Sequence, residues 1–477
     1  MSKYEAISGL EPRRALEWFC DISEVPRVPH KQERITGFLV SRIKELGLDC
    51  YHDATGNVVA WKPASPGYEN APSVAIQAHM DVVCEKVPGS THNFETDPVT
   101  LLRDGDKIFA DGTTLGADNG LGMAFILAFL EDKNARHPAL EAIFTANEET
   151  DMTGAYNLDY SRIKSRIILS LDAEAVRVSG NGELEVEMTF GKTLDPVPQG
   201  SVARELRIAG LWGGHSGKNA MAERGNAVIL CNRVLLALDK KIPYRMCAIQ
   251  AGAGMSSAIA RNATCVITFP STEAAAAAAV AEEQFALFRE ELAGKEPDMQ
   301  LAFSPCEMPS SVFSGGTARR LTRLLTMLPE GVFSRSERNT MESNVNTGVV
   351  ETRDSDLFVT TLIRSNRASK KYYLLDKIYA VCDTLDVVHT IGRDLPHWEY
   401  AVDDRLAGLL KEIYPDRPFE TGQGTNECGI FGQNIPGASI IGLGPIAHDP
   451  HSPNEHIFGA EAKLAWDRFT EFMARLQ

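Results

Sequence analysis

Four short apolar runs in the chain each end in polar residues. The runs span residues 74–78, 142–146, 167–171 and 438–443. A stretch with helical periodicity at 121–130 lies between the first two runs, and strands that alternate with helices favour an α/β sheet. Because ligand sites in open α/β sheets form at the carboxyl ends of the strands, we expect the polar residues after these runs to gather at one edge of the sheet.

The first sixty residues predict helical structure followed by a strand pair. Apolar residues recur at helical spacing up to Leu46, and Gly47 is a suitable helix stop. Residues 50–61, interrupted by Gly56-Asn57, are typical of a β-hairpin.

The pattern changes after Gly182. Alternating apolar and polar residues at 184–188 and 205–208 predict strands of a sheet with one solvated face. Helices and a further strand are expected at 226–238, 274–292, 321–328 and 357–363, the last being the strand. The α/β pattern returns near Arg393, with a helix at 406–413.

These changes predict two domains. We expect an α/β catalytic domain, with a mostly parallel sheet flanked by helices, to be formed by residues 1–183 and 393–477. An α+β domain, residues 184–392, is inserted into it. At 477 residues the chain is long enough for both domains to bury a core of their own.

Composition narrows the classes of partner. The formal net charge is -16, which argues against nucleic acid or an anionic membrane as the main partner. The nine cysteines include no Cys-x-x-Cys pair, so reduced thiols are expected and a thiolate zinc site is not. Without a signal segment or a long apolar span, the chain is expected in the cytoplasm.

The residues that follow the apolar runs, with two from other segments, form a set of metal ligands. The candidates are His79, Asp118, Glu149, Asp172 and His451. Two imidazoles and three carboxylates suit zinc, with cobalt or manganese as alternatives. Five ligands are too many for one catalytic zinc with an open position, so we expect two divalent ions that share a carboxylate.

Two more carboxylates have expected roles in the reaction. Asp81 shares a strand face with His79, where it would fix the tautomer of a metal-bound imidazole. Glu148 and Glu149 point apart in extended backbone, so one can bind metal while the other takes a proton from the metal-bound water. We assign Glu148 as the general base and Glu149 as the ligand, with the reverse order as the alternative.

The motifs that carry these residues resemble the M20 metallopeptidases, most closely the aminoacyl-histidine dipeptidase branch. The matching motifs are His79-Met-Asp81-Val-Val-Cys-Glu-Lys86, Asp111-Gly-Thr-Thr-Leu-Gly-Ala-Asp118-Asn-Gly-Leu-Gly122, Asn147-Glu-Glu-Thr150, Leu171-Asp172, Gly213-Gly-His215-Ser-Gly217, Arg224-Gly-Asn226-Ala227 and His451-Ser-Pro-Asn-Glu455. The resemblance implies that Asp118 bridges the two metals and that the inserted domain is a lid. It also implies that His215 meets the substrate near the scissile carbonyl, from the same chain or from a partner subunit.

Two segments depart from the family pattern. Relatives tend to have Cys-Ala-Gly-Gly after the aspartate of the third strand, whereas Ser179-Gly-Asn-Gly182 stands nearby in this chain. Relatives carry His-Ala-Gly-Leu-Glu-Cys-Gly where this chain has Gly422-Gln-Gly-Thr-Asn-Glu427-Cys-Gly429, so Glu427 is retained and the histidine is not. We expect Glu427 to contact the substrate, and Arg364 and Asn262 to do so from the lid.

The resulting hypothesis is a dipeptidase that attacks short peptides, Xaa-His dipeptides among them, with a metal-bound hydroxide. It would act as a monomer or homodimer. Two alternatives remain: an amidohydrolase or deacylase of N-acyl amino acids, and a catalytically silent peptide-binding protein on the same scaffold.

Overall fold

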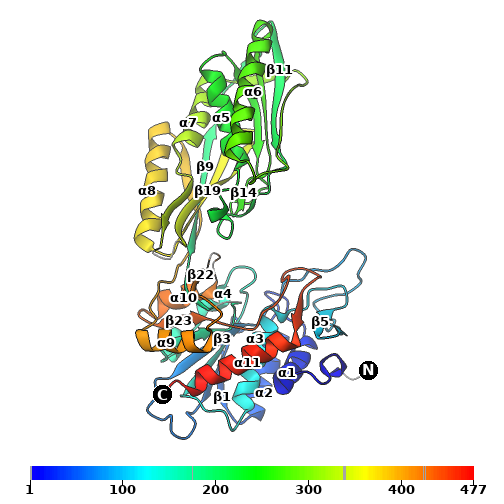
Figure 1. The fold of residues 1–477 in the computed structure, drawn as a ribbon, viewed down its shortest axis with the longest axis vertical. Coiled ribbons are helices and arrows are strands. Elements are labelled where there is room, and N and C mark those ends of the chain that lie inside the picture. Colours follow the sequence, from blue (N-terminus) through cyan, green and yellow to red (C-terminus); the bar gives the residue numbers. More distant parts are fainter. Residues whose placement is uncertain (1–2, 174–175, 337–339, 423, 425) are drawn as a thin grey trace. The chain divides into compact units, whose positions relative to one another are not determined.

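The computed structural model describes residues 3–173, 176–336, 340–422, 424 and 426–477, and it divides the chain into two compact units. Unit 1 comprises Met1–Gly180 and His397–Gln477, and unit 2 comprises Asn181–Pro396 (Figure 1). The inserted domain expected from the sequence, residues 184–392, therefore begins three residues later and ends four residues earlier than unit 2. The second difference arises because β21 (Val388–Leu395) still pairs within the sheet of unit 2.

Unit 1 is built on a sheet that has eight strands in its described residues. In pairing order they are β1 (Asp49–His52), β2 (Val58–Lys62), β6 (Leu140–Thr145), β3 (Val74–His79), β7 (Ile167–Ser170), β23 (Ser439–Gly442), β8 (Arg177–Gly180) and β22 (Glu420–Gly422). The four central strands β6, β3, β7 and β23 are the four apolar runs, and they pair in parallel. The pairs β1–β2, β2–β6 and β23–β8 are antiparallel, so the sheet is mixed. Its centre is parallel, which agrees with the mostly parallel α/β sheet expected from the sequence.

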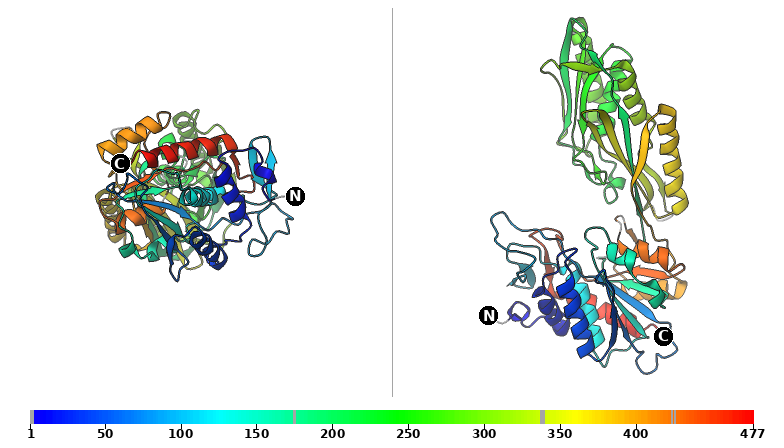
Figure 2. Two further views of the ribbon diagram at one scale, coloured as in Figure 1. Left: turned by 90° about the horizontal axis from the view of Figure 1, so that it is seen from below. Right: turned by 180° about the vertical axis from the view of Figure 1, so that it is seen from behind.

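Helices cover both faces of this sheet (Figure 2). One face carries α1 (Arg13–Ser23), α2 (Glu33–Glu45), α3 (Ala117–Glu131), α9 (Asp404–Ile413) and α11 (Gly459–Ala474). The other carries α4 (Thr153–Asn157) and α10 (Glu427–Asn434). A small separate sheet is formed by β4 (Leu101–Asp104), β5 (Lys107–Ala110) and β24 (His456–Phe458).

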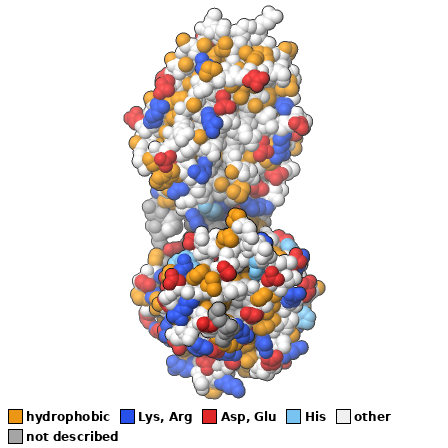
Figure 3. Space-filling model, turned by 90° about the vertical axis from the view of Figure 1, so that its right-hand side faces the viewer, with side chains coloured by type: hydrophobic (Ala, Val, Ile, Leu, Met, Phe, Trp, Pro, Cys, Tyr) orange, Lys and Arg blue, Asp and Glu red, His pale blue; other side chains and the backbone are white. Residues whose placement is uncertain are grey.

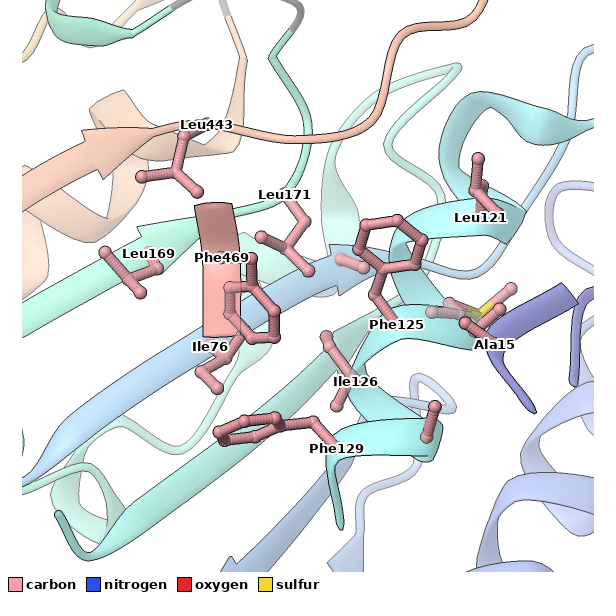
Figure 4. Packing of buried hydrophobic residues seen from close by; sticks show 14 of the residues in the cluster. Ala15, Ile76, Leu121, Phe125, Ile126, Phe129, Leu169, Leu171, Leu443 and Phe469 are labelled. Carbon is pink, nitrogen blue, oxygen red and sulfur yellow. The ribbon is translucent and has the colours of Figure 1, made fainter. Parts of the chain in front are cut away.

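Strand β3 shows why the apolar runs are continuous. Val74 and Ile76 pack into the core on one face, whereas Ala75 packs into the core on the other. A strand with helices on both faces buries every side chain, so most of its residues are apolar and they do not alternate with polar ones. Figure 4 shows the first core, where Phe125 and Phe129 of α3 pack near Phe469 of α11.

Unit 2 contains an antiparallel sheet with helices packed against it. The sheet consists of β16 (Gln300–Pro305), β11 (Ser201–Ala209), β15 (Ala263–Pro270), β13 (Arg245–Ala251), β19 (Met341–Thr352), β20 (Asp356–Ser365), β9 (Gly182–Gly191) and β21, with β18 (Gly331–Arg335) paired to β19. The helices are α5 (Ala227–Asp239), α6 (Ala274–Glu291), α7 (Gly315–Met327) and α8 (Ala368–Leu385). Their apolar residues and those of the sheet form one core, which fits the α+β architecture expected for the inserted domain.

Helix α8 was not predicted from the sequence. Its buried residues Leu374, Ile378 and Cys382 recur at a spacing of four, but exposed tyrosines at 372 and 373 interrupt the apolar pattern. Two short pairs complete unit 2: β10 (Leu194–Pro196) with β17 (Ser311–Phe313), and β12 (Gly214–His215) with β14 (Ala258–Ile259).

The surface offers no large area of one charge on the face shown in Figure 3, where acidic and basic side chains are interspersed on each unit. None of the helices in the described residues is long and apolar enough to cross a lipid bilayer.

Candidate metal centre

The carboxyl ends of three adjacent strands of unit 1 bring candidate ligands together. His79 is the last residue of β3, Glu148 and Glu149 follow β6, and Asp172 follows β7. Because β6, β3 and β7 are parallel neighbours, these residues emerge at the same edge of the sheet. Asp118 joins them from the first turn of α3, where Asp118 and Asn119 depart from helical geometry and are joined by a cis peptide bond.

Asp118 lies between two imidazoles. The Nε2 atom of His79 is 3.1 Å from Oδ1 of Asp118, and Nε2 of His451 is 3.4 Å from Oδ2. His451 also lies 3.1 Å from Oε2 of Glu149. The two oxygens of one carboxylate therefore face two different histidines, which is the geometry of a bridging ligand.

Three groups of side chains place all their ligand atoms within 4.8 Å of one another. The groups are His79 with Asp118 and Asp172, Asp118 with Glu149 and His451, and His79 with Glu148 and Glu149. The first two share Asp118 and together contain all five predicted ligands. The buried Oε1 of Glu149 has no hydrogen-bond partner in the described structure, so a donor atom is left for a cation.

The electrostatics of the cluster also fit bound cations. Burial and the neighbouring Asp172 raise the pKa of Glu148 well above its usual value. Burial and Asp118 raise the pKa of Asp172 to about 6. Asp118 and Glu149, in turn, raise the pKa of His451 to about 10. Neighbouring carboxylates repel one another when ionised, which is why the pKa values of Glu148 and Asp172 are raised. Bound divalent cations would offset this repulsion.

Asp81 is completely buried beside this cluster and contacts more than the sequence suggested. Its Oδ1 accepts the backbone N–H of Glu148 and its Oδ2 that of Glu149, each at 3.0 Å. The distance from Oδ1 to Nδ1 of His79 is 3.6 Å, longer than a hydrogen bond. Asp81 therefore holds the backbone of the two glutamates and lies next to His79 as well.

Arg27 was not predicted as a site residue; it lies in the loop after α1 and is 4% exposed. Its Nη1 donates to the carbonyls of Met80, at 3.1 Å, and Asp81, at 3.0 Å, while Nη2 donates to the carbonyl of Gly116. The guanidinium thus connects the loop after β3 to the start of α3. No periodicity or motif of the sequence pointed to this role.

Glu455 supports the same segment from the other side. Its carboxylate accepts the backbone N–H of Gly116 at 2.8 Å and that of Asp118 at 3.1 Å. Glu455 belongs to the motif that begins at His451, so its presence in the site could be expected from the sequence. Its contacts with Gly116 and Asp118 could not. Together, the hydrogen bonds of Arg27 and Glu455 hold the backbone of residues 116–118 and thereby position Asp118.

Glu427 begins α10 and is 2% exposed. Its Oε2 accepts hydrogen bonds from Gln77 Nε2 at 2.7 Å and Thr145 Oγ1 at 2.5 Å. Burial raises its pKa to about 8. The structure thus places Glu427 in a buried polar cluster beneath the ends of β3 and β6, and residues 423 and 425 of its motif lie outside the described residues.

In unit 2, His215 and Arg364 are adjacent. Nδ1 of His215 accepts the backbone N–H groups of Gly217 and Lys218 at 3.1 Å each, and Nε2 lies 3.2 Å from Nη2 of Arg364. Burial and the Arg364 charge lower the pKa of His215 to about 4. Arg364 is fully buried, bonds Ser216 Oγ at 3.1 Å and pairs with Glu183.

Asn262 does not join this pair. It is exposed, and its backbone carbonyl accepts the N–H of Gly252 at 3.0 Å. Among the described contacts, none connects its side chain to His215 or Arg364.

Several known proteins are similar to this chain in sequence and fold. Residues 75–474 match the family described as Peptidase family M20/M25/M40. The chain is 28% identical to the cytosol non-specific dipeptidase of Escherichia coli K12, over 98% of this chain and 99% of that one. Its structure is similar to that of the aminoacylhistidine dipeptidase of Vibrio alginolyticus, with a TM-score of 0.93 and 31% identity over 99% of both chains. The aminopeptidase PepT of Bacillus cereus, at 14% identity and a TM-score of 0.55 over 98% of this chain and 99% of that one, shares the fold alone.

Proposed function

The chain belongs to peptidase family M20/M25/M40, and from that membership and the geometry of the metal centre we propose that it is a metal-dependent dipeptidase. It is similar along nearly its whole length to two proteins named as dipeptidases. The main structural observation in support of hydrolytic activity is the pair of ligand groups that share Asp118.

Two divalent cations fit the donor set. His79, Asp118 and Asp172 would hold one, and Asp118, Glu149 and His451 the other. Imidazole and carboxylate donors without thiolate suit zinc, with cobalt or manganese as alternatives. When bound, such ions polarise a peptide carbonyl and lower the pKa of a water molecule.

Glu148 is the general base in this proposal. It belongs to neither of the two groups that share Asp118, so its carboxylate remains available to take a proton from water and to deliver it to the leaving amine. The backbone N–H of Glu148 is anchored on Asp81. Asp81 is thus proposed to position the base and its neighbour Glu149, in addition to orienting His79.

His215 is proposed to contact the scissile carbonyl. Its Nδ1 accepts two backbone N–H groups, and its Nε2 faces Nη2 of Arg364, which can only donate. For Nε2 to donate a hydrogen bond to a carbonyl oxygen, the substrate must replace this contact with Arg364. Arg364 is already bonded to Ser216 and Glu183, so we propose that it acts on the substrate chiefly through His215. Substrate contacts by Glu427 and Asn262 remain predictions.

The expected substrates are unblocked dipeptides. Xaa-His dipeptides are included because one similar protein is named an aminoacylhistidine dipeptidase. The name of the similar Escherichia coli protein, a cytosol dipeptidase, supports a cytoplasmic location.

A substrate comparison tests this function against the alternatives. The purified protein is loaded with zinc, manganese or cobalt in turn and given Ala-His, Ala-Ala and their N-acetylated forms. We expect cleavage of the unblocked dipeptides only. Preferential cleavage of the acetylated forms would favour a deacylase, and binding of peptides without turnover under all three metals would favour a peptide-binding protein.

A further inference from the structure

Unit 2 contains a cavity of about 370 Å³ that the proposed chemistry does not use. Its walls come from the segment after β12, the start of α5, the end of α6 and strands β18 and β19. A water molecule occupies about 30 Å³, so the cavity has room for a ligand of several non-hydrogen atoms. The polar residues that matter most are Arg224, Asn226, Glu330 and Asn344.

Two ionisable side chains that line this cavity, Arg224 and Glu330, form no ion pair with another described residue. Arg233 and Glu291 neutralise each other through two contacts of 2.6 and 2.7 Å. Arg224 instead donates to the carbonyl of Gly213 and stacks on Trp212, and it forms no ion pair within the described chain. One guanidinium is therefore available to an anionic group.

Glu330 is the second charge. Its half-buried carboxylate accepts Asn226 Nδ2 at 3.0 Å and the backbone N–H of Thr347 at 2.8 Å. No lysine, arginine or histidine among the described residues pairs with it. Burial raises its pKa to about 7, which is the response of a carboxyl group that lacks a nearby cation.

Asn344 adds an acceptor that is also unused. It is 3% exposed and lines the cavity. Its Nδ2 donates to the carbonyl of Ser216 at 2.8 Å, while its Oδ1 is buried with no partner in the described structure. A buried carbonyl oxygen of this kind requires a donor, and an ammonium group would supply one.

We propose that this cavity binds the zwitterion of a free amino acid. The α-ammonium group would pair with Glu330 and donate to Oδ1 of Asn344, and the α-carboxylate would pair with Arg224. A simple anion would leave Glu330 without a partner, and a simple cation would leave Arg224 without one. Binding itself does not depend on the proposed hydrolysis, although amino acids are the products of that reaction.

The cavity is connected to His215 through the backbone. Arg224 bonds the carbonyl of Gly213, and Asn344 bonds that of Ser216, so both hold the segment 213–217 that carries His215. A bound amino acid would restrain this segment. If the proposed dipeptidase activity is correct, the site would let product concentration act on the histidine that meets the substrate.

Isothermal titration calorimetry on the intact, metal-loaded protein tests the proposal. The probes are L-alanine, N-acetyl-L-alanine, which lacks the ammonium group, and L-alaninamide, which lacks the carboxylate. The cavity variants are Glu330→Gln and Arg224→Met. The matched controls are Glu283→Gln and Arg289→Met, both exposed on α6, ion-paired and outside the cavity lining.

We expect saturable binding of L-alanine with a Kd that rises at least about tenfold in each cavity variant and stays unchanged in the controls. Neither analogue should bind comparably. Hydrogen exchange provides a second readout that needs no variant: L-alanine should slow exchange at residues 213–217 of the wild-type protein.

Three results would overturn the proposal. They are the absence of saturable L-alanine binding, binding that is equally strong in cavity and control variants, and an analogue that binds as tightly as L-alanine. Dipeptide hydrolysis by the wild-type protein is measured separately, so failure of the amino-acid site and failure of the proposed function give different results. Thermal unfolding of each variant checks that it is folded.

Discussion

Glu148 and Glu149 are adjacent in the sequence, but their surroundings differ. Glu149 lies 3.1 Å from His451 and belongs to a ligand group with Asp118, whereas Glu148 belongs to no group that contains Asp118. The difference depends on Asp81, which binds both backbone N–H groups and so sets the direction of each side chain. At the residue scale, this backbone anchor is proposed to separate the ligand, Glu149, from the base, Glu148.

Replacing the base tests this separation. We expect Glu148→Gln to lower kcat by about 10²- to 10⁴-fold, because the amide cannot take a proton. Metal content, measured by mass spectrometry of the purified protein, should remain two ions per chain. The matched control is Glu95→Gln, an exposed change in unit 1. Loss of one metal from Glu148→Gln would instead support the reverse order, with Glu148 as ligand and Glu149 as base.

His215 leads to a prediction of pH dependence. Its pKa is about 4 in the folded chain and about 6.5 when unfolded, so the unfolded state binds more protons between these values. Its contribution to stability is therefore present above pH 6.5 and is lost as the pH falls toward 4. In thermal unfolding of the wild type and His215→Gln, we expect the wild type to lose stability relative to the variant across this window. A difference that is constant with pH would contradict the neutral histidine.

At the scale of elements, the candidate metal centre depends on the contact between the loop after β3 and the start of α3. Arg27 donates to backbone carbonyls of both segments, and Glu455 accepts two backbone N–H groups at the start of α3. An added Cβ at Gly116 would approach Nη2 of Arg27 to 2.3 Å. The glycine therefore leaves the space that the guanidinium needs.

Removing the guanidinium should weaken the metal centre without touching a ligand. We expect Arg27→Met to lower metal affinity by about 10- to 100-fold, the usual effect of losing support around a ligand. Arg27→Lys should recover only part of this loss, because an ammonium group cannot reproduce the planar fork. Competition with a chromophoric chelator measures the affinity, and Arg14→Met, exposed on α1, is the control. Unchanged affinity in Arg27→Met would show that these contacts serve folding alone.

At the scale of the whole molecule, the residues with proposed roles are divided between the two units. All five predicted ligands, Asp81 and Glu148 lie in unit 1, whereas His215, Arg364 and the proposed amino-acid cavity lie in unit 2. Each unit has its own hydrophobic core. Loss of metal should therefore change the local stability of unit 1 and leave that of unit 2 largely unchanged.

Chelation provides the test. We expect EDTA to abolish dipeptide cleavage and added zinc, manganese or cobalt to restore it. Without cations the crowded carboxylates of Asp118, Glu148 and Asp172 repel one another, so hydrogen exchange should accelerate at the ends of β3, β6 and β7. Strands of the unit 2 sheet should show no such change. Full activity after complete metal removal would contradict the proposed function.

The sequence by itself determined the central strands of unit 1 and the set of ligand types. The buried parallel strands could be predicted because a strand covered on both faces is mostly apolar, and that property is local. The positions of His79, Glu149 and Asp172 after such strands were sufficient to predict one site. Helix α8 was missed because exposed tyrosines interrupt its apolar spacing.

Only the tertiary structure decided how those residues are held. Arg27 and Gly116 are 89 positions apart, and Gly116 and Glu455 are 339 apart, so no local pattern reports their contacts. The proposed amino-acid site likewise depends on which charges remain unpaired after distant segments pack together. Local periodicity specifies what a segment becomes, whereas the partner of each buried charge depends on contacts that form only in the folded chain.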